Sequence, residues 1–178
     1  MEQKVNVWKA NLTNGLILGL TGVVYSLVMY FLDLTFNQVQ GFVFLVLQVA
    51  ILYFLLKSYR DNYMHGQITY GQSVGAGVII CLYSAIIGAI FTYLLYTVID
   101  SGLTEKQLAF IEEKMLTKGA PQEAVDAAMG IQRKIMKPEI LAPFSILGGT
   151  FWGTILSLVV SIFIKKEGNP LLDNTANQ

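Results

Sequence analysis

Four long stretches of the chain are apolar and contain no charged side chain. Each stretch lies between two charged residues: Lys9 and Asp33, Asp33 and Lys57, Asp61 and Asp100, or Glu139 and Lys165. An α-helix rises about 1.5 Å per residue, so about 20 apolar residues cross the hydrocarbon core of a bilayer. The pattern therefore predicts four membrane-spanning helices, over residues 12–34, 39–56, 74–99 and 140–164.

The links between the predicted spans are polar. Residues 35–38 form a very short connection, so the first two helices are expected to be an antiparallel hairpin. Residues 57–70 are rich in Asn, Tyr and Gly and are expected to form a loop. The first apolar run is too long for the core of a signal peptide and lacks an A-x-A-like cleavage site, so we expect it to be retained as a span.

The third apolar run opens with the glycine-containing sequence YGQSVGAG, residues 70–77. A dinucleotide-binding turn requires the pattern G-x-G-x-x-G between a strand and a helix. Here Gly75 and Gly77 are followed by Ile80 where the third glycine would stand, and the run continues without charge to Ile99. The segment is therefore predicted to be a membrane helix and not a nucleotide-binding loop.

Small residues recur at helical spacing along one face of three predicted spans. They are Gly15, Gly19, Gly22 and Ser26 in the first, Gly77, Cys81, Ser84 and Gly88 in the third, and Ser145, Gly149, Gly153, Ser157 and Ser161 in the fourth. Lipid provides little hydrophobic force between helices, so their association depends on close backbone approach. We expect these faces to pack helices, within the chain or in a homo-oligomer. The second span lacks such a face and is expected to be the most exposed to lipid.

Residues 103–137, between the third and fourth spans, have the pattern of an amphipathic helical hairpin. Two signals mark its first helix: Thr104 and Gln107 are spaced as a capping box, and Leu103 and Leu108 as a hydrophobic staple. Its predicted apolar face consists of Leu108, Ile111 and Met115. Gly119 is its expected C-terminal stop.

The second helix of this hairpin is predicted to begin near Pro121, which suits a first helical turn, and to end before Pro138. Its predicted apolar face consists of Ala124, Ala128, Ile131 and Ile135. We expect the hairpin to cap the bundle or to lie on the membrane surface. The alternative is a docking surface for a protein partner.

The composition excludes several classes of protein. The chain has 178 residues, of which 54% are hydrophobic and only 13% are charged, whereas soluble domains carry about 25% charged residues. The net charge is zero and no basic stripe is present, so a nucleic-acid partner is not expected. The single cysteine, Cys81, allows no disulfide within one chain, and His65 is the only histidine. No cofactor or metal site is expected.

The basic residues favour an orientation with both termini in the cytoplasm. It places inside the residues that flank the inner helix ends: Lys4, Lys9, Lys57, Arg60, Lys165 and Lys166. The first loop, outside, then carries no positive charge, in agreement with the positive-inside rule. The hairpin weakens this argument, because its six lysine and arginine residues would lie outside. The expected topology is N-in and C-in.

Four polar residues near the spans are candidates for chemistry. Gln48 lies near the centre of the second span, where an amide is costly without a partner. We expect an interhelical hydrogen bond there, and the alternative is a lining residue of a polar path. Asp33, Asp100 and Glu139 lie at the ends of the first, third and fourth spans on the same, external side. Three converging carboxylates would bind a cation, and hydrated surface carboxylates are the alternative.

The sequence also resembles a known family. The resemblance rests on four features: ITYGQSVGAG at the start of the third span, YTVID at its end, a helical insertion with Met and Pro, and KK after the fourth span. Over nearly its whole length the chain is similar to the bacterial domain of unknown function 4199 family. The most specific elements are Tyr70, Gly71, Gln72 and Asp100. The resemblance implies a small bacterial inner-membrane protein and provides no catalytic residues.

The expected architecture is a single integral membrane domain over residues 1–178, all-α, with four spanning helices and the inserted hairpin. The sequence contains no Ser-His-Asp arrangement, zinc motif, P-loop or deep intramembrane acid pair, so we do not expect an enzyme. The expected function is an accessory or assembly component of the inner membrane. The alternative is a small oligomeric transporter or channel.

Overall fold

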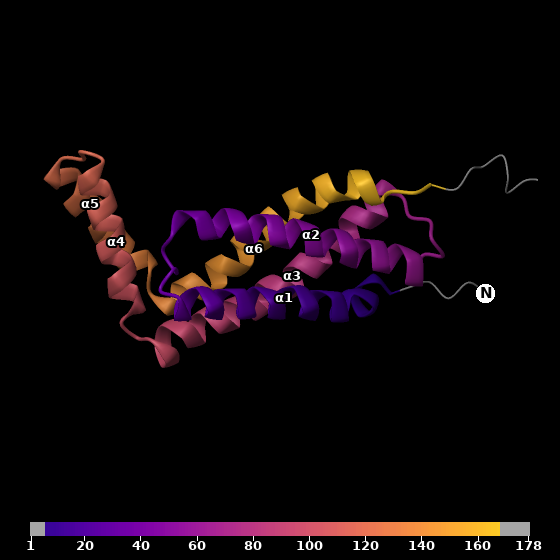
Figure 1. Cartoon of the computed structure of the whole chain (residues 1–178), viewed down its shortest axis with the longest axis horizontal. Coiled ribbons are helices and arrows are strands. Elements are labelled where there is room, and N and C mark those ends of the chain that lie inside the picture. Colours follow the sequence, from indigo (N-terminus) through magenta and orange to yellow (C-terminus); the bar gives the residue numbers. More distant parts are fainter. Residues whose placement is uncertain (1–5, 168–178) are drawn as a thin grey trace, which may run out of the picture.

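The structure, a computed structural model, describes residues 6–167 and is all-α, as predicted (Figure 1). Its elements are α1 (Val7–Phe31), α2 (Gln38–Tyr63), α3 (Tyr70–Leu94), the π-helical turn η1 (Leu95–Ile99), α4 (Leu103–Thr117), α5 (Gln122–Ile135) and α6 (Pro138–Ile164). Four helices are long and apolar enough to cross a membrane: α1, α2, α3 together with η1, and α6. The predicted fold class is confirmed.

Helices α1, α2 and α3 extend past the predicted apolar limits at the end of the bundle where α1 begins and α6 ends. Helix α2 continues through Lys57 to Tyr63, so most of the predicted polar loop is helical. The Asn6 side chain caps α1 by accepting from the amides of Trp8 and Lys9. Apolarity marks only the part of a helix inside hydrocarbon, whereas caps and polar turns continue the helix into the interface. Lys4, used in the topology argument, lies outside the described residues.

Helix α3 is the centre of the bundle and packs between α1 and α6 along much of its length. Helix α2 joins them mainly through its C-terminal half, where Leu52, Leu56 and Tyr59 are buried. Its N-terminal half is exposed, with Val39 and Phe42 among the outward side chains. The core therefore lies nearer the end of the bundle where α1 begins and α6 ends.

The glycines of α1 and α6 contact α3 on two different sides. Gly15 and Gly19 of α1 lie against Tyr83 and Ile87, and a Cβ added at Gly19 would lie 2.7 Å from the Ile87 Cδ1 atom. On the other side the matched pairs are Gly77 with Ser157, Gly149 with Ala85, and Gly153 with Cys81. Gly22 has a looser contact, because a Cβ added there would lie 3.5 Å from the Phe44 Cζ atom of α2.

Gly88 is the exception among the predicted packing glycines. A Cβ added there would meet no described atom within 4 Å. The assignment of Gly88 to packing inside the chain is therefore wrong. Its neighbour one turn earlier, Ala85, is the residue of α3 that meets Gly149. A small-residue stripe shows where approach is allowed, but the crossing point of two helices decides which members are used.

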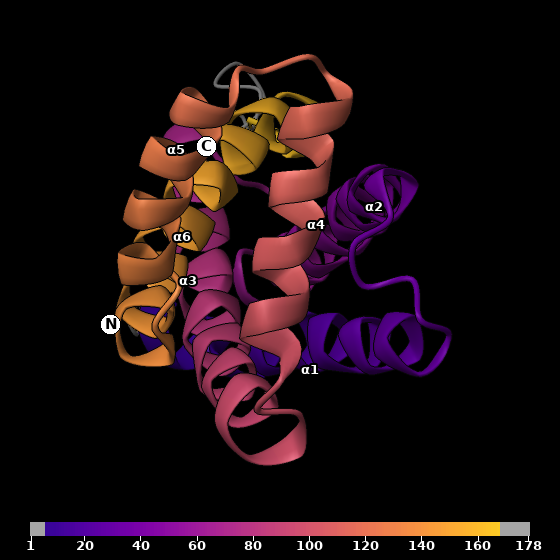
Figure 2. The ribbon, with the colours of Figure 1, turned by 90° about the vertical axis from the view of Figure 1, so that its left-hand side faces the viewer.

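Helices α4 and α5 lie side by side across one end of the bundle (Figures 1 and 2). They share a small core of buried Leu108, Val125, Met129 and Met136, against which Ile111, Met115 and Leu141 also pack. Leu141 belongs to α6, so this core joins the two helices to the start of the last span. Gly119, at φ +78°, ends α4 in the left-handed conformation that glycine favours, as predicted.

Two details of the predicted hairpin are wrong. Helix α4 begins at Leu103 with Gly102 as its N-cap, so Thr104 is inside the helix and forms no capping box. Asp100 binds the free amides at the start of α4 instead. Its carboxylate accepts from the Gly102 amide at 3.0 Å, and its carbonyl accepts from the Leu103 amide at 3.1 Å.

The second wrong detail is the buried face of α5. Val125 and Met129 face α4, whereas Ile131 and Ile135 are exposed. Helix α5 carries two apolar stripes, and the position of α4 determines which of them is buried.

Candidate functional site

A polar cluster lies at the end of the bundle where α1 and η1 end and α4 begins. Asp100, the residue after η1, is its centre. Its Oδ2 accepts hydrogen bonds from Lys106 Nζ at 2.8 Å and from the Tyr30 hydroxyl at 3.3 Å, and its Oδ1 accepts from the Gly102 amide at 3.0 Å. One carboxylate thus ties the end of α1 and the start of α4 to the central helix.

Two further contacts hold α4 on the bundle. The Tyr96 hydroxyl of η1 donates a 2.7 Å hydrogen bond to Gln107 Oε1. Phe36, in the link between α1 and α2, stacks on Phe110 of α4 with ring centroids 5.7 Å apart. Together with the Asp100 cluster, these contacts attach α4 to three separate segments of the bundle.

The electrostatics of the cluster favour its ionised form. The Lys106 ammonium, which donates to the carboxylate, holds the pKa of Asp100 below its usual value. The same contact holds the pKa of Lys106 above its usual value. The Lys106 side chain is 62% exposed and that of Asp100 only 15%, so the carboxylate is the sheltered partner. The pair therefore acts as a charged clasp between the end of η1 and α4, and the lowered pKa of Asp100 is opposite to the raised pKa expected of a general base.

The turn η1 is the one π-helical element among residues 6–167. Its wider winding lets the Asp100 amide reach back to the Leu95 carbonyl at 2.9 Å. Such turns occur most often at functional positions. Here the turn sets the direction of Tyr96 and Asp100, the two side chains that bind α4. The sequence YTVID indicated this segment, but the partners Lys106 and Gln107 had no distinctive pattern around them.

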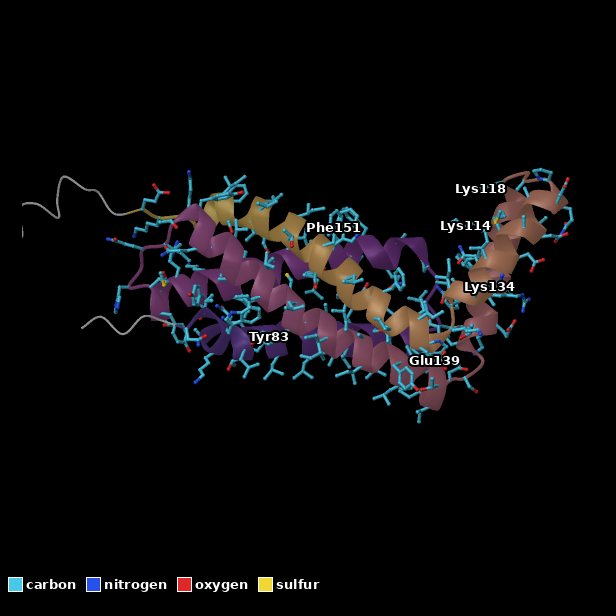
Figure 3. All side chains as sticks on the ribbon, turned by 180° about the vertical axis from the view of Figure 1, so that it is seen from behind. Tyr83, Lys114, Lys118, Lys134, Glu139 and Phe151 are labelled. Atoms are coloured by element: carbon cyan, nitrogen blue, oxygen red, sulfur yellow. The ribbon has the colours of Figure 1, made fainter. Side chains whose placement is uncertain are left out.

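The three predicted external carboxylates do not form a cation site. Asp33, Asp100 and Glu139 lie at the same end of the bundle, but the described residues contain no group of three acidic, His or Cys side chains able to hold a metal ion. The Asp100 carboxylate is occupied by Lys106. Asp33 lies in the turn after α1 with φ +58°, and Glu139 is exposed in the first turn of α6 (Figure 3). The converging arrangement considered from the sequence is therefore wrong.

Gln48 does not form the predicted interhelical hydrogen bond. Its side chain is half-buried on α2 and takes part in no hydrogen bond among the described residues. The buried interhelical hydrogen bond lies elsewhere: the Ser161 hydroxyl of α6 donates to the Ser73 hydroxyl of α3 at 2.8 Å. Helix α2 contacts α1 in this half through other residues: Tyr25 donates to the Gln40 carbonyl at 2.7 Å and packs against Phe44.

A groove of about 340 Å³ opens on the bundle surface between α3 and α6. Its lining is wholly apolar and consists of Ile86, Ala89, Ile90, Tyr93, Leu94, Ala142, Pro143 and Ile146. Ligand sites combine apolar walls with a few polar groups that orient the ligand. This groove has room for a hydrocarbon chain but offers no group that would orient a substrate or hold a cofactor.

Comparisons with known proteins were made for the whole chain. A family model described as "Protein of unknown function (DUF4199)" matches residues 13–166. No curated protein and no solved structure matches the chain. The matched region includes most of α1 and all other described helices, together with the Asp100 cluster. The chain therefore belongs to the DUF4199 family, the family that its sequence motifs indicated.

Proposed function

We propose that this protein is a multi-pass accessory component of the bacterial inner membrane, which binds and supports another membrane protein and does not itself catalyse a reaction. The main support is the dense centre of the bundle. Gly153 lies on Cys81 there, and Gly77 lies on Ser157, so the helices meet almost backbone to backbone. Transporters instead place charged side chains or broken helices around a site near the midplane.

The orientation that we propose has both termini in the cytoplasm. The basic residues Lys57, Arg60, Lys165 and Lys166 belong to the end of the bundle where α2 and α6 finish. Arg60 Nη1 donates to the Ile164 carbonyl at 3.2 Å, which holds these two helix ends together. A short antiparallel bridge between Ile68 and Lys166 adds the loop before α3. The opposite end, with the Asp100 cluster and α4–α5, would then face away from the cytoplasm.

The second candidate is a small transporter or channel built by several copies. The observation that favours it is Gln48, an amide in the middle of a span that forms no hydrogen bond among the described residues. Such a group is costly in hydrocarbon and is relieved when it meets a second copy or a water-filled path.

One experiment separates the two candidates. The tagged chain is extracted in mild detergent, its companions are identified by mass spectrometry, and the purified chain is then placed in liposomes for ion-flux assays beside empty liposomes. The proposed function predicts a hetero-partner at a fixed ratio and no flux above that of the empty liposomes. A homo-oligomer that conducts ions would replace the proposal with the second candidate.

A further inference from the structure

Helix α4 has one side turned toward the bundle and one turned away. Gln107 marks the bundle side, because it accepts the hydrogen bond from Tyr96 of η1. Successive residues turn by about 100° around a helix axis, so Glu105, two residues earlier, lies on the opposite side. Glu105 Oε2 lies 3.5 Å from Arg133 Nη1 of α5. Arg133 therefore also lies on the side away from the bundle.

Ile131 and Ile135 lie on the bundle side of α5. Each is two residues from Arg133, one before it and one after it, so each is turned about 160° away from Arg133. They remain 60% and 45% exposed. Both therefore point to the membrane side of the hairpin, yet the protein itself covers neither.

The charges of the hairpin are sorted in the same way. Lys114 and Lys118 follow Gln107 by two and three helical turns and share its side of α4, and Figure 3 shows both beyond the end of the bundle. By the same rotation Glu105 and Glu112 of α4 and Asp126 of α5 lie on the other side, whereas Glu113 borders Lys114 on the α4 surface. The face with Lys114, Lys118, Ile131 and Ile135 is consequently mainly basic and apolar. We call it the inner face.

The position of the hairpin brings the inner face close to lipid. Only residues 100–102 separate η1 from α4, and only residues 136–137 separate α5 from α6. The hairpin runs across the end of the bundle, and the turn between its helices extends past the edge of the spans (Figure 1). Lys118 lies at this protruding turn, whereas Ile131 and Ile135 lie in the last turns of α5, next to the start of the last span at Pro138.

We propose that the inner face rests on the anionic phospholipid headgroups of the bilayer that α3 and α6 cross. The two isoleucines would enter the boundary between headgroups and acyl chains, and the two lysines would bind lipid phosphates. Interfacial helices combine these two kinds of side chain, and each basic residue near an anionic surface strengthens binding by about fivefold. This inference does not rest on the proposed accessory function.

The test uses the full chain in vesicles, with Cys81→Ala as background. An environment-sensitive fluorophore is attached to Ile131→Cys on the inner face, or to Asp126→Cys on the opposite side of the same helix as a matched control. The vesicles contain phosphatidylcholine alone or with phosphatidylglycerol. Quenching by aqueous iodide and by lipids spin-labelled near the headgroup reports which phase each label contacts.

In vesicles with phosphatidylglycerol, the label at position 131 should resist iodide and be quenched by spin-labelled lipid, whereas the label at 126 should show the reverse. The protection at 131 should weaken in phosphatidylcholine alone. Exchanging both Lys114 and Lys118 for Glu should lower the ratio of docked to undocked hairpin by roughly tenfold or more. Arg133→Glu reverses a charge on the outer side and should leave the protection unchanged.

Three results would overturn the proposal. Equal iodide quenching at 131 and 126 would show that the inner face meets water. Equal protection in both lipid mixtures would remove the role of anionic headgroups. Protection that rises with the protein-to-lipid ratio would assign the face to a second copy of the chain.

Discussion

Gly153 of α6 and Cys81 of α3 lie in direct contact, so closely that a methyl group added at Gly153 would overlap the Cys81 β-carbon. Cys81 is buried, and the hydroxyl of Ser157, one turn beyond Gly153, bonds back to the Gly153 carbonyl at 2.6 Å. The Ser73–Ser161 hydrogen bond joins the same two helices two turns away, but at Gly153 itself the contact depends on the close fit of the two backbones. A change of one methyl group should therefore be measurable.

Gly153→Ala should lower the thermal stability of the detergent-extracted protein. The added methyl group overpacks the contact with Cys81, which typically costs about 1–3 kcal/mol. Gly88→Ala is the matched control, because the same addition there meets open space and removes a helix-destabilising glycine. Equal melting temperatures for both variants would show that α3 and α6 do not cross at Gly153.

Gln48→Leu should leave the stability of the isolated chain unchanged or raise it, because the amide has no hydrogen-bond partner in the described structure and leucine is favoured in hydrocarbon. Thermal unfolding and native mass spectrometry in detergent measure stability and oligomeric state together. If the variant instead breaks an oligomer that the native chain forms, Gln48 bonds to another copy. Destabilisation of a monomer would contradict the placement of Gln48 altogether.

The Asp100–Lys106 clasp should open at low pH. The pKa of Asp100 is lowered by the hydrogen bond from Lys106. The contribution of Asp100 to the stability of the folded state is therefore present above its unfolded-state pKa of about 3.9, and it is lost as pH falls through the lower folded-state pKa. The pKa of Lys106 is raised. The contribution of Lys106 to the stability of the folded state is therefore present below its unfolded-state pKa of about 10.4, and it is lost as pH rises through the higher folded-state pKa.

Spin labels at Asp126→Cys and Gln67→Cys would follow this opening, because they lie on the hairpin and in the loop at the opposite end of the bundle. Their distance distribution should be narrow near neutral pH and broaden below about pH 4. Asp100→Asn should give the broad distribution at every pH. Glu139→Gln, a neighbouring exposed carboxylate, serves as the control and should retain the pH response.

Labelling of these two introduced cysteines would determine the orientation of the chain in the membrane. Asp126→Cys on α5 should react with a membrane-impermeant maleimide added to intact spheroplasts, and Gln67→Cys should react only after lysis. Both native side chains are exposed, whereas Cys81 is buried and should give little background. Position 119 is unsuitable for a label because Gly119 has φ +78°. The reverse labelling pattern would place the hairpin in the cytoplasm.

Part of the fold follows from the apolar pattern, because hydrocarbon imposes a simple requirement on any segment that crosses it. The uncharged runs locate all four long helices, and Gly119 correctly ends α4. The failures share a cause. Thr104 has the spacing of a capping box, but Asp100 satisfies the free amides first. Gln48 has the chemistry for an interhelical bond, but Tyr25 of α1 meets Gln40 and Phe44 of α2 instead.

The sequence by itself determined the all-α class, the number of long apolar helices and the family, because these depend on local composition and short motifs. Only the tertiary structure decided that Gly153 and not Gly88 is used for packing, that Asp100 pairs with Lys106, and that Ile131 stays exposed. Each of these outcomes depends on where two helices cross or which sides they present to each other. A helix bears several suitable faces, and a single sequence does not encode the choice among them locally.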